Sequence, residues 1–231
     1  MFSEISQDNP NEGIDFLSQV YTTANAGFSG RVTVPVLSDK KRRTIVNNES
    51  SEIIRIFNSA FNDLTGDQSD YYPERLRAEI DDINQSVYDN INNGVYRAGF
   101  ATTQSAYEAA FKRLFDTLNL VEQRLGQQRY LVGDLITEAD WRLFTTLIRF
   151  DAVYYGHFKT NLKRIEDYPN LSNYVRDLYQ IDGVADTVDI EHIKTHYYVS
   201  QTTVNPTQIV PVGPSLDFTR EHDRDRFVSV A

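Results

Sequence analysis

The sequence predicts a mainly α protein, in which a helical bundle follows a smaller unit that holds a β-hairpin and a helix. Beyond Pro73, apolar residues recur at spacings of three, four and seven positions, which is typical of amphipathic helices packed against one another. Before Pro73, a Val-rich segment with alternating polarity indicates a strand. At 231 residues, the chain is long enough for one large domain or two small ones.

The chain starts with a polar segment, residues 1–13, that we interpret as an irregular lead-in. Apolar side chains at positions 16, 17, 20 and 21 form a helical stripe and predict a helix over residues 15–21. The glycines at 27 and 30 and the polar residues between them are expected to end this segment.

A β-hairpin is predicted next. Residues 31–37 alternate and are β-branched, so they predict a strand, and residues 44–46 predict its partner. The basic run at 40–43 is interpreted as the charged turn between them, in preference to a phosphate-binding patch. Since Pro35 has no N–H to donate, we expect it at a sheet edge or on a cis peptide bond.

A second helix is predicted to begin near Glu49, because Asn and Ser supply cap oxygens and acidic residues suit a first turn. The polar segment 63–72 is interpreted as a linker. The predicted domains are therefore a first domain at 1–62, a linker with the start of the first bundle helix at 63–83, and an all-helical domain with an extended tail at 84–231.

The strongest local signal in the bundle is the segment at 136–141. Thr137 is placed to cap the amide of Asp140, whose carboxylate returns to the amide of Thr137, so a helix start is expected there. From Tyr197 onward the sequence is rich in Pro, Gly and charge, and predicts an extended tail. Apolar stripes predict three of the helices: Leu76/Ile80/Ile83/Val87, Ala106/Ala110/Leu114/Leu118/Val121 and Leu143/Leu147/Phe150/Val153.

Composition excludes several classes of function. The chain carries 23 Lys and Arg against 33 Asp and Glu, a net charge of −10, so a nucleic-acid partner is not expected. It has no cysteine, which excludes thiol nucleophiles, disulfides and thiolate metal sites within these residues. The four histidines show no metal-binding spacing, and no metal is expected. Neither an apolar stretch long enough to span a membrane nor a secretory signal is present, so we expect no membrane partner and a cytoplasmic protein.

Six segments resemble the glutathione transferases, and in detail the Xi class, the glutathionyl-hydroquinone reductases. They are SGRVTVPVL at 29–37, TIVNNESSEIIRIFN at 44–58, NNGVYRAGFATTQSAYE at 92–108, YLVGDLITEADWRLFTTLIRFDAVYYGHFK at 130–159, YPNLSNYVRDLYQ at 168–180 and HIKTHYYVSQTTVNPTQIVPVGP at 192–214. The resemblance implies the second half of a thioredoxin-like domain before a helical domain, glutathione as co-substrate, quinone or hydroquinone conjugates as substrates, and a homodimer.

The resemblance also implies four glutathione contacts: Arg31, the main chain of Val34, and Glu49 with Ser50. An extended tripeptide can pair with free main-chain groups at Val34, and a helix N-terminus with a carboxylate suits a γ-glutamyl group. The residues alone leave other interpretations open. Val34-Pro35 can simply end an edge strand, a Glu-Ser pair can be only a cap, and a strand-start Arg is usually just solvated.

Two tyrosines, Tyr96 and Tyr197, match the positions that face the substrate in the family. Phenol hydroxyls can hydrogen-bond a hydroquinone oxygen or stabilise charge that develops at sulfur. Taken without the resemblance, they are two of fourteen tyrosines, and packing is the simpler interpretation.

The sequence departs from the family in three places. Ser38 stands where we expect Trp, Gln201 stands where we expect His, and the N-terminal part that carries the nucleophilic Cys has no match. In the family a low-pKa thiolate attacks the glutathione sulfur. We therefore expect impaired reductase activity for this chain as given. The alternatives are a non-catalytic relative that binds or dimerises, and a chain completed by a separate thioredoxin-like fragment.

Overall fold

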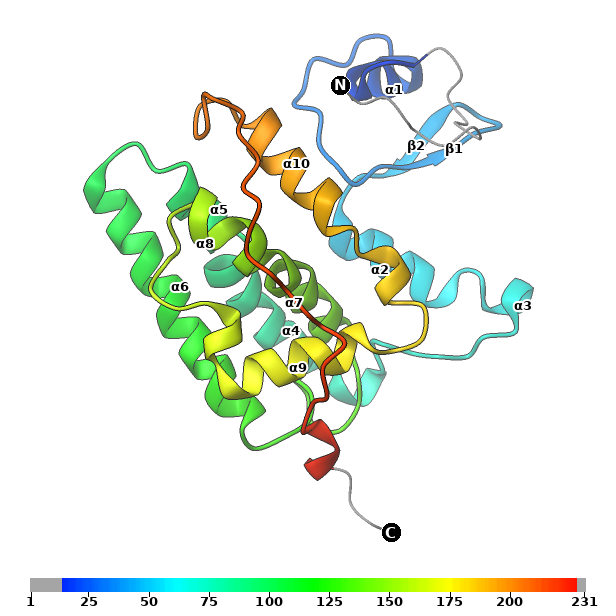
Figure 1. Cartoon of the computed structure of the whole chain (residues 1–231). Helices are drawn as coiled ribbons and strands as arrows, with labels where there is room; N and C mark the ends of the chain where they lie inside the picture. The colour runs from blue at the N-terminus through cyan, green and yellow to red at the C-terminus, as the bar shows by residue number, and fades with distance from the viewer. Residues whose placement is uncertain (1–13, 228–231) are drawn as a thin grey trace. The chain divides into compact units, whose positions relative to one another are not determined.

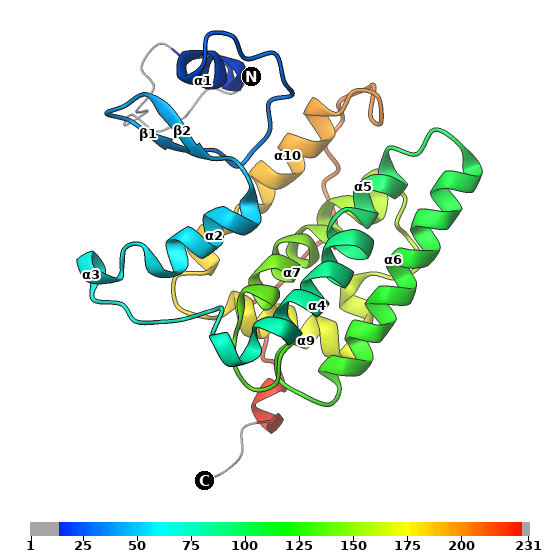
Figure 2. The ribbon, with the colours of Figure 1, turned by 180° about the vertical axis from the view of Figure 1, so that it is seen from behind.

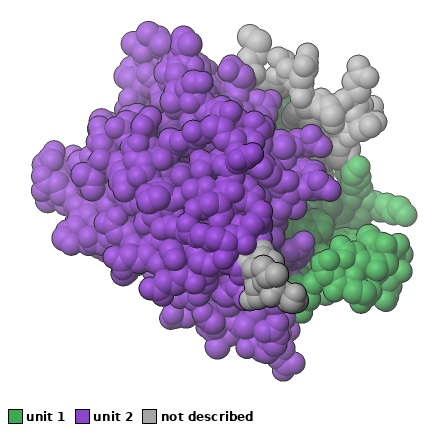
Figure 3. Space-filling model, turned by 60° about the horizontal axis from the view of Figure 1, so that its bottom comes forward, with its two compact units in different colours: residues 1–70 green, residues 71–231 purple. Residues whose placement is uncertain are grey.

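The computed structural model describes residues 14–227, so the predicted lead-in at 1–13 lies outside the described residues. The chain forms two compact units, one up to Asp70 and one from Tyr71 onward, which Figure 3 shows in different colours. This boundary falls inside residues 63–83, the predicted linker with the start of the first bundle helix. The prediction of a mainly α protein is confirmed, because the described residues are mostly helical and carry a sheet of two strands.

The first unit contains short elements only. They are helix α1 (Leu17–Ala24), strands β1 (Leu37–Asp39) and β2 (Thr44–Asn47), helix α2 (Ser50–Ser59) and the single helical turn α3 (Asn62–Thr65). The strands pair antiparallel, with Ser38 opposite Ile45 and Asp39 opposite Thr44. Asp39 Oδ1 accepts hydrogen bonds from the amides of Lys41 and Arg42 and so holds the basic run as a hairpin turn.

The predicted strand at 31–37 is wrong, since β1 begins only at Leu37. The cause lies at Thr33, whose main chain bonds a side chain instead of a neighbouring strand. The Tyr21 hydroxyl donates to the Thr33 carbonyl oxygen at 2.8 Å and accepts from the Thr33 amide at 3.3 Å. Pro35 has no N–H to offer a ladder, and its bond to Val34 is cis, as one of the two predicted alternatives had it.

The second unit is a helical bundle (Figures 1 and 2). Its longest helix, α6, has 22 residues and is about 33 Å long at 1.5 Å per residue. The helices are α4 (Arg77–Val87), α5 (Gly94–Gly99), α6 (Gln104–Leu125), α7 (Glu138–Arg149), α8 (Tyr155–His157), α9 (Pro169–Tyr179) and α10 (Ile190–Ser200), with π-helical segments η2 (Tyr88–Asn92) and η3 (Phe150–Tyr154) and 3-10 turns η1 (Glu74–Leu76), η4 (Ile165–Asp167), η5 (Ala185–Thr187) and η6 (Arg224–Phe227).

The predicted helix start at Thr137 is confirmed: the Asp140 carboxylate accepts from the Thr137 amide at 2.8 Å, and the Asp140 amide donates to the Thr137 carbonyl oxygen at 3.1 Å. Asp140 is fully buried there. Besides the Thr137 amide, its carboxylate accepts from the Leu131 amide and from the Tyr174 hydroxyl, each at 2.8 Å. Burial raises the pKa of Asp140, and these hydrogen bonds oppose that rise. The box therefore ties α7 to α9 as well as starting a helix.

The extended tail begins later than predicted, because α10 continues through Tyr197 to Ser200. The tail then crosses the bundle from the end of α10 and returns to the end of α6 (Figure 1). There the fully buried Arg224 donates to the carbonyl oxygens of Leu125, Gln128 and Arg129. A guanidinium at this position satisfies carbonyls that a helix C-terminus leaves without intrahelical partners.

Within residues 14–227, no helix combines the length and the apolar composition needed to cross a lipid bilayer.

Candidate functional site

Three tyrosine hydroxyls form a hydrogen-bonded row in the second unit. The hydroxyls of Tyr96 and Tyr197 lie 2.5 Å apart, and those of Tyr197 and Tyr154 lie 2.8 Å apart. The structure thus brings together the two tyrosines predicted from the sequence, which are 101 positions apart, and adds a third.

Irregular helical geometry places two of these side chains. Tyr96 lies on α5, directly after the π-helical segment η2, and Tyr154 is the last residue of the π-helical segment η3. Asn92, the last residue of η2, donates to the carbonyl oxygen of Arg142 and accepts from the Thr146 hydroxyl, so η2 is bonded to α7. π-Helical turns are rare and are frequent at functional sites.

The row runs from the surface to the interior. Tyr96 is 36% exposed, whereas Tyr197 is 7% exposed and Tyr154 is 2% exposed. Burial raises the pKa of Tyr154 and of Tyr197 well above the ordinary value, because a phenolate is poorly solvated inside the bundle. Both inner phenols therefore stay protonated at neutral pH and can support the hydrogen bonding of the outer one.

Aromatic rings surround the row. Phe158 contacts the rings of Tyr96, Tyr154 and Tyr197, with centroid distances of 5.4, 5.5 and 6.0 Å. Phe100 stacks on Tyr96 at 6.3 Å and is 46% exposed. Only glycine fits at position 99, because a Cβ there would lie 2.1 Å from Cδ1 of Phe158. The result is an aromatic wall with the partly exposed Tyr96 at its edge, an arrangement suited to a planar ring with oxygen substituents.

A histidine lies behind the row. His157 Nε2 and Gln201 Oε1 are 2.8 Å apart, and the His157 ring contacts Tyr198 at 4.6 Å. Because the amide oxygen is an acceptor, this contact places the proton of a neutral His157 on Nε2. Burial lowers the pKa of His157, which favours the neutral form. Gln201, one of the departures from the family pattern, thus joins the end of α10 to the end of α8.

The four predicted glutathione contacts all lie in the first unit. Arg31 and Val34 lie in the extended segment before β1, and Val34 is 75% exposed. Within residues 14–227, neither the amide nor the carbonyl of Val34 has a hydrogen-bond partner. These main-chain groups are thus available to an extended peptide ligand.

Glu49 and Ser50 form the start of α2. Glu49 is the N-cap residue, and its Oε1 accepts hydrogen bonds from the Ser51 amide at 3.3 Å and the Ser51 hydroxyl at 3.1 Å. Ser50 is the exposed first residue of the helix. Glu49 alone acts as the cap in this structure, and the exposure of both residues leaves their side chains accessible to a ligand.

Sequence reasoning missed Tyr154. It lies four residues after Phe150, so it continues the apolar stripe of the preceding helix and is predicted as a core residue. A sharper signal was its place in the sequence, because Tyr154 lies within residues 130–159, one of the segments that resemble the family. Among the described residues, no group of three His, Cys, Asp or Glu side chains is placed to hold a metal ion.

Comparisons with known proteins confirm the predicted glutathione-transferase-like fold. Residues 104–177 match the family of the glutathione S-transferase C-terminal domain. The chain is 60% identical over 203 residues to the glutathionyl-hydroquinone reductase PcpF of Sphingobium chlorophenolicum, which covers 88% of this chain and 65% of that relative. Among solved structures, glutathione-bound YqjG, a glutathione transferase homologue from Escherichia coli K-12, superposes with a TM-score of 0.92 at 52% identity and covers 94% of this chain and 70% of its own.

A Xi-class glutathione transferase from Natrialba magadii superposes equally well, with a TM-score of 0.93 at 46% identity over 97% of this chain and 68% of its own. The chain spans 65% of the length of PcpF and 64% of that of the reductase YqjG.

Proposed function

This chain belongs to the Xi class of glutathione transferases, and on that premise we propose that it acts in the glutathione-dependent reduction of glutathionyl-hydroquinones. The observation that carries the proposal is the row of phenols from Tyr96 through Tyr197 to Tyr154, with an aromatic wall beside its exposed end. A hydroquinone is a planar ring with two hydroxyls. It matches a wall that offers ring contacts together with the phenol of the partly exposed Tyr96.

In this proposal Tyr96 hydrogen-bonds a hydroquinone oxygen. Tyr197 and Tyr154, kept protonated by burial, hold the Tyr96 hydroxyl in place and stabilise charge that develops on the departing ring. The main chain of Val34 pairs with the cysteinyl backbone of glutathione, Glu49 and Ser50 receive its γ-glutamyl end, and Arg31 adds a further contact.

The reaction needs a thiolate. It attacks the glutathione sulfur of the conjugate, so that an S–S bond forms, the aryl C–S bond breaks and the ring carbon takes a proton; a second glutathione then releases glutathione disulfide. These 231 residues contain no cysteine, so the mixed disulfide cannot form on them. We therefore propose that turnover by this chain on its own is impaired.

The test measures binding and turnover of glutathionyl-menadiol with excess glutathione. We expect saturable binding by calorimetry and an impaired turnover, above the uncatalysed rate and far below that of PcpF. Replacing Tyr96 or Tyr197 by Phe should weaken binding about 3- to 10-fold, the effect of losing one hydrogen bond. Tyr179→Phe is the control, because the Tyr179 hydroxyl has no hydrogen-bond partner among residues 14–227. Absence of binding would overturn the substrate class, and turnover as fast as that of PcpF would overturn the impairment.

The absence of cysteine also favours a second candidate, a non-catalytic glutathione-transferase-like protein that binds or dimerises. The same assay separates the two. Weak turnover that depends on Tyr96 and Tyr197 supports the enzyme, whereas binding without any turnover above background supports the binding protein.

Two further parts of the proposal concern assembly and location. We propose a homodimer, as the resemblance implies, and sedimentation of the full chain tests it. We also propose a cytoplasmic location, where thiols such as glutathione are kept reduced. Cell fractionation tests that part.

A further inference from the structure

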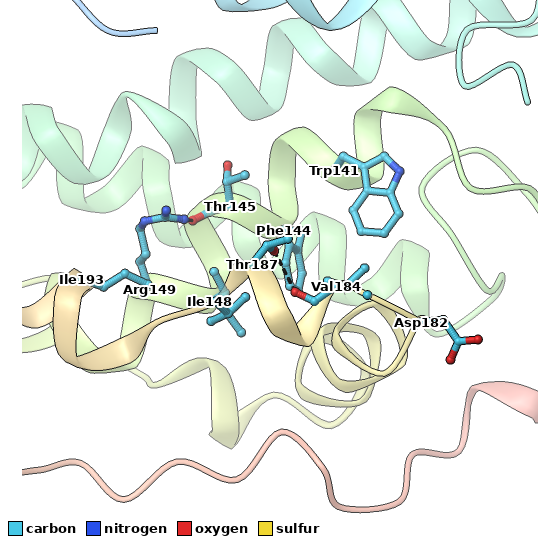
Figure 4. Close-up of a pocket in the computed structure, with 11 residues that line it drawn as sticks. Trp141, Phe144, Thr145, Ile148, Arg149, Asp182, Val184, Thr187 and Ile193 are labelled. Carbon is cyan, nitrogen blue, oxygen red and sulfur yellow. Dashed lines mark hydrogen bonds between the residues drawn. The ribbon is translucent and has the colours of Figure 1, made fainter. Parts of the chain in front are cut away.

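The second unit contains a cavity of about 560 Å³ that includes none of the three tyrosines of the candidate site. It lies between α7, the loop at 182–188 and the first turns of α10 (Figure 4). Its volume falls within the range of about 300–1,000 Å³ that small-molecule sites occupy.

The walls of this cavity are mostly apolar. Phe144 and Ile148, at 5% and 2% exposure, reach it from the core side of α7. Half-buried Trp141, Val184, Val188 and Ile193 complete the apolar lining. The hydroxyl of Thr187, another lining residue of the loop, is already used, since it donates to the Val184 carbonyl oxygen at 2.7 Å. The lining therefore favours an apolar body over a sugar or a nucleotide.

The two ends of the cavity carry opposite charges. Arg149, the last residue of α7, lies at one end beside Ile193, and Asp182 lies at the other end near Trp141 (Figure 4). Trp141 and Arg149 are eight residues apart on one helix, a rise of about 12 Å. The guanidinium of Arg149 and the indole of Trp141 thus lie at opposite ends of the cavity.

The guanidinium of Arg149 has N–H groups that remain available to donate hydrogen bonds to a ligand. One of its nitrogens, NH1, donates to the Thr145 carbonyl oxygen at 2.6 Å. Among residues 14–227, no carboxylate lies within ion-pair distance of it. Its charge reaches α10, where burial, His192 and Arg149 together lower the pKa of His196. A planar guanidinium beside an apolar wall is well suited to bind a carboxylate through two hydrogen bonds.

We propose that this cavity binds an amphipathic monoanion, a carboxylate on an apolar body, with the carboxylate on Arg149 and the apolar end against Trp141. Asp182 adds a negative charge near the Trp141 end of the cavity, and this charge disfavours the reverse orientation.

The test uses the full chain and decanoate as the probe. Trp141 is the chain's single tryptophan, so its fluorescence reports occupancy of the cavity directly. We expect a saturable fluorescence change with a stoichiometry of one by calorimetry. Arg149→Gln should weaken decanoate binding by about tenfold or more, as expected for a lost charge-assisted hydrogen bond. Binding of the neutral analogue decanol should change little in the same variant.

Two further variants serve as controls. Arg113→Gln removes the same charge from an exposed position on α6 and should leave decanoate binding as in the parent. Arg149→Lys retains the charge and should recover part of the lost affinity, which guards against a variant that simply fails to fold. The proposal is overturned if decanoate gives no saturable signal below its micellar concentration, if Arg149→Gln and Arg113→Gln behave alike, or if decanol binding falls as much as decanoate binding.

Discussion

The two units are stabilised in different ways. In the second unit, apolar side chains from nearly every helix form one continuous core, in which residues such as Leu118, Leu143 and Leu171 have no exposed surface. In the described part of the first unit, only Tyr21 and Ile53 are buried hydrophobic residues. Burial of apolar area is the main favourable term in folding. The second unit therefore carries its own stability, whereas the first depends on a few specific contacts.

Tyr21 shows what replaces a core in the first unit. Its hydroxyl bonds both main-chain groups of Thr33 and also accepts from the Asn48 side chain at 3.2 Å, and its ring lies 4.8 Å from that of Phe28. One side chain thus joins α1, the segment before β1 and the residues before α2. The segments that carry the predicted glutathione contacts are therefore held by a polar hub, the hydrogen bonds of Tyr21 to Thr33 and Asn48, whereas the phenol row is held by an apolar core.

The largest loss of stability is expected when a substitution creates a new cavity in the core of the second unit. Leu143→Ala removes a fully buried side chain of α7 and should lower the free energy of unfolding by about 2–5 kcal/mol. Urea denaturation followed by Trp141 fluorescence measures it, since Trp141 lies on the same helix. Leu120→Ala on α6 is the matched control, because Leu120 is 63% exposed and should cost no more than about 0.5 kcal/mol. Equal losses in the two variants would contradict the comparison.

A smaller effect is expected from breaking the polar hub. Tyr21→Phe keeps the ring and removes the hydroxyl, and should destabilise the first unit by about 1–2 kcal/mol. Amide hydrogen exchange should then become about 5- to 30-fold faster at Thr33 and along β2, with no change on α6 or α7. Tyr179→Phe is the control, since it removes a phenol without a hydrogen-bond partner among the described residues. Unchanged exchange at Thr33 would show that the hub does not hold the segment.

The smallest effect is expected in the pH dependence of stability, to which the buried Tyr154 of the second unit contributes. Burial raises the folded-state pKa of Tyr154 above its unfolded value of about 10. Its contribution to stability is therefore complete below pH 10 and is lost as the pH rises toward the folded pKa, by up to about 1.4 kcal/mol per pH unit. Tyr154→Phe should make the alkaline loss of stability shallower in urea denaturation at a series of pH values. Val153→Ala, a neighbouring change without a titratable group, should lower stability equally at every pH, and parallel curves for both variants would refute the assignment.

Local sequence signals determined much of this protein. The helices of the bundle follow from apolar spacing, the start of α7 follows from Thr137 and Asp140, and the turn of the hairpin follows from Asp39 and the basic run after it. Each of these features depends on residues within a few positions of one another, so that propensity, capping and periodicity are readable in the sequence itself.

The tertiary structure decided the rest. The expected strand at 31–37 is lost because a side chain twelve positions away takes the main-chain groups of Thr33, and Tyr154 joins Tyr197 across 43 positions. Periodicity describes Tyr154 as a core residue and cannot say that its hydroxyl meets another. Composition alone determined that these 231 residues supply no thiolate, because a missing residue type needs no fold to be recognised. Which phenols meet is a question of long-range packing, and only the folded bundle answers it.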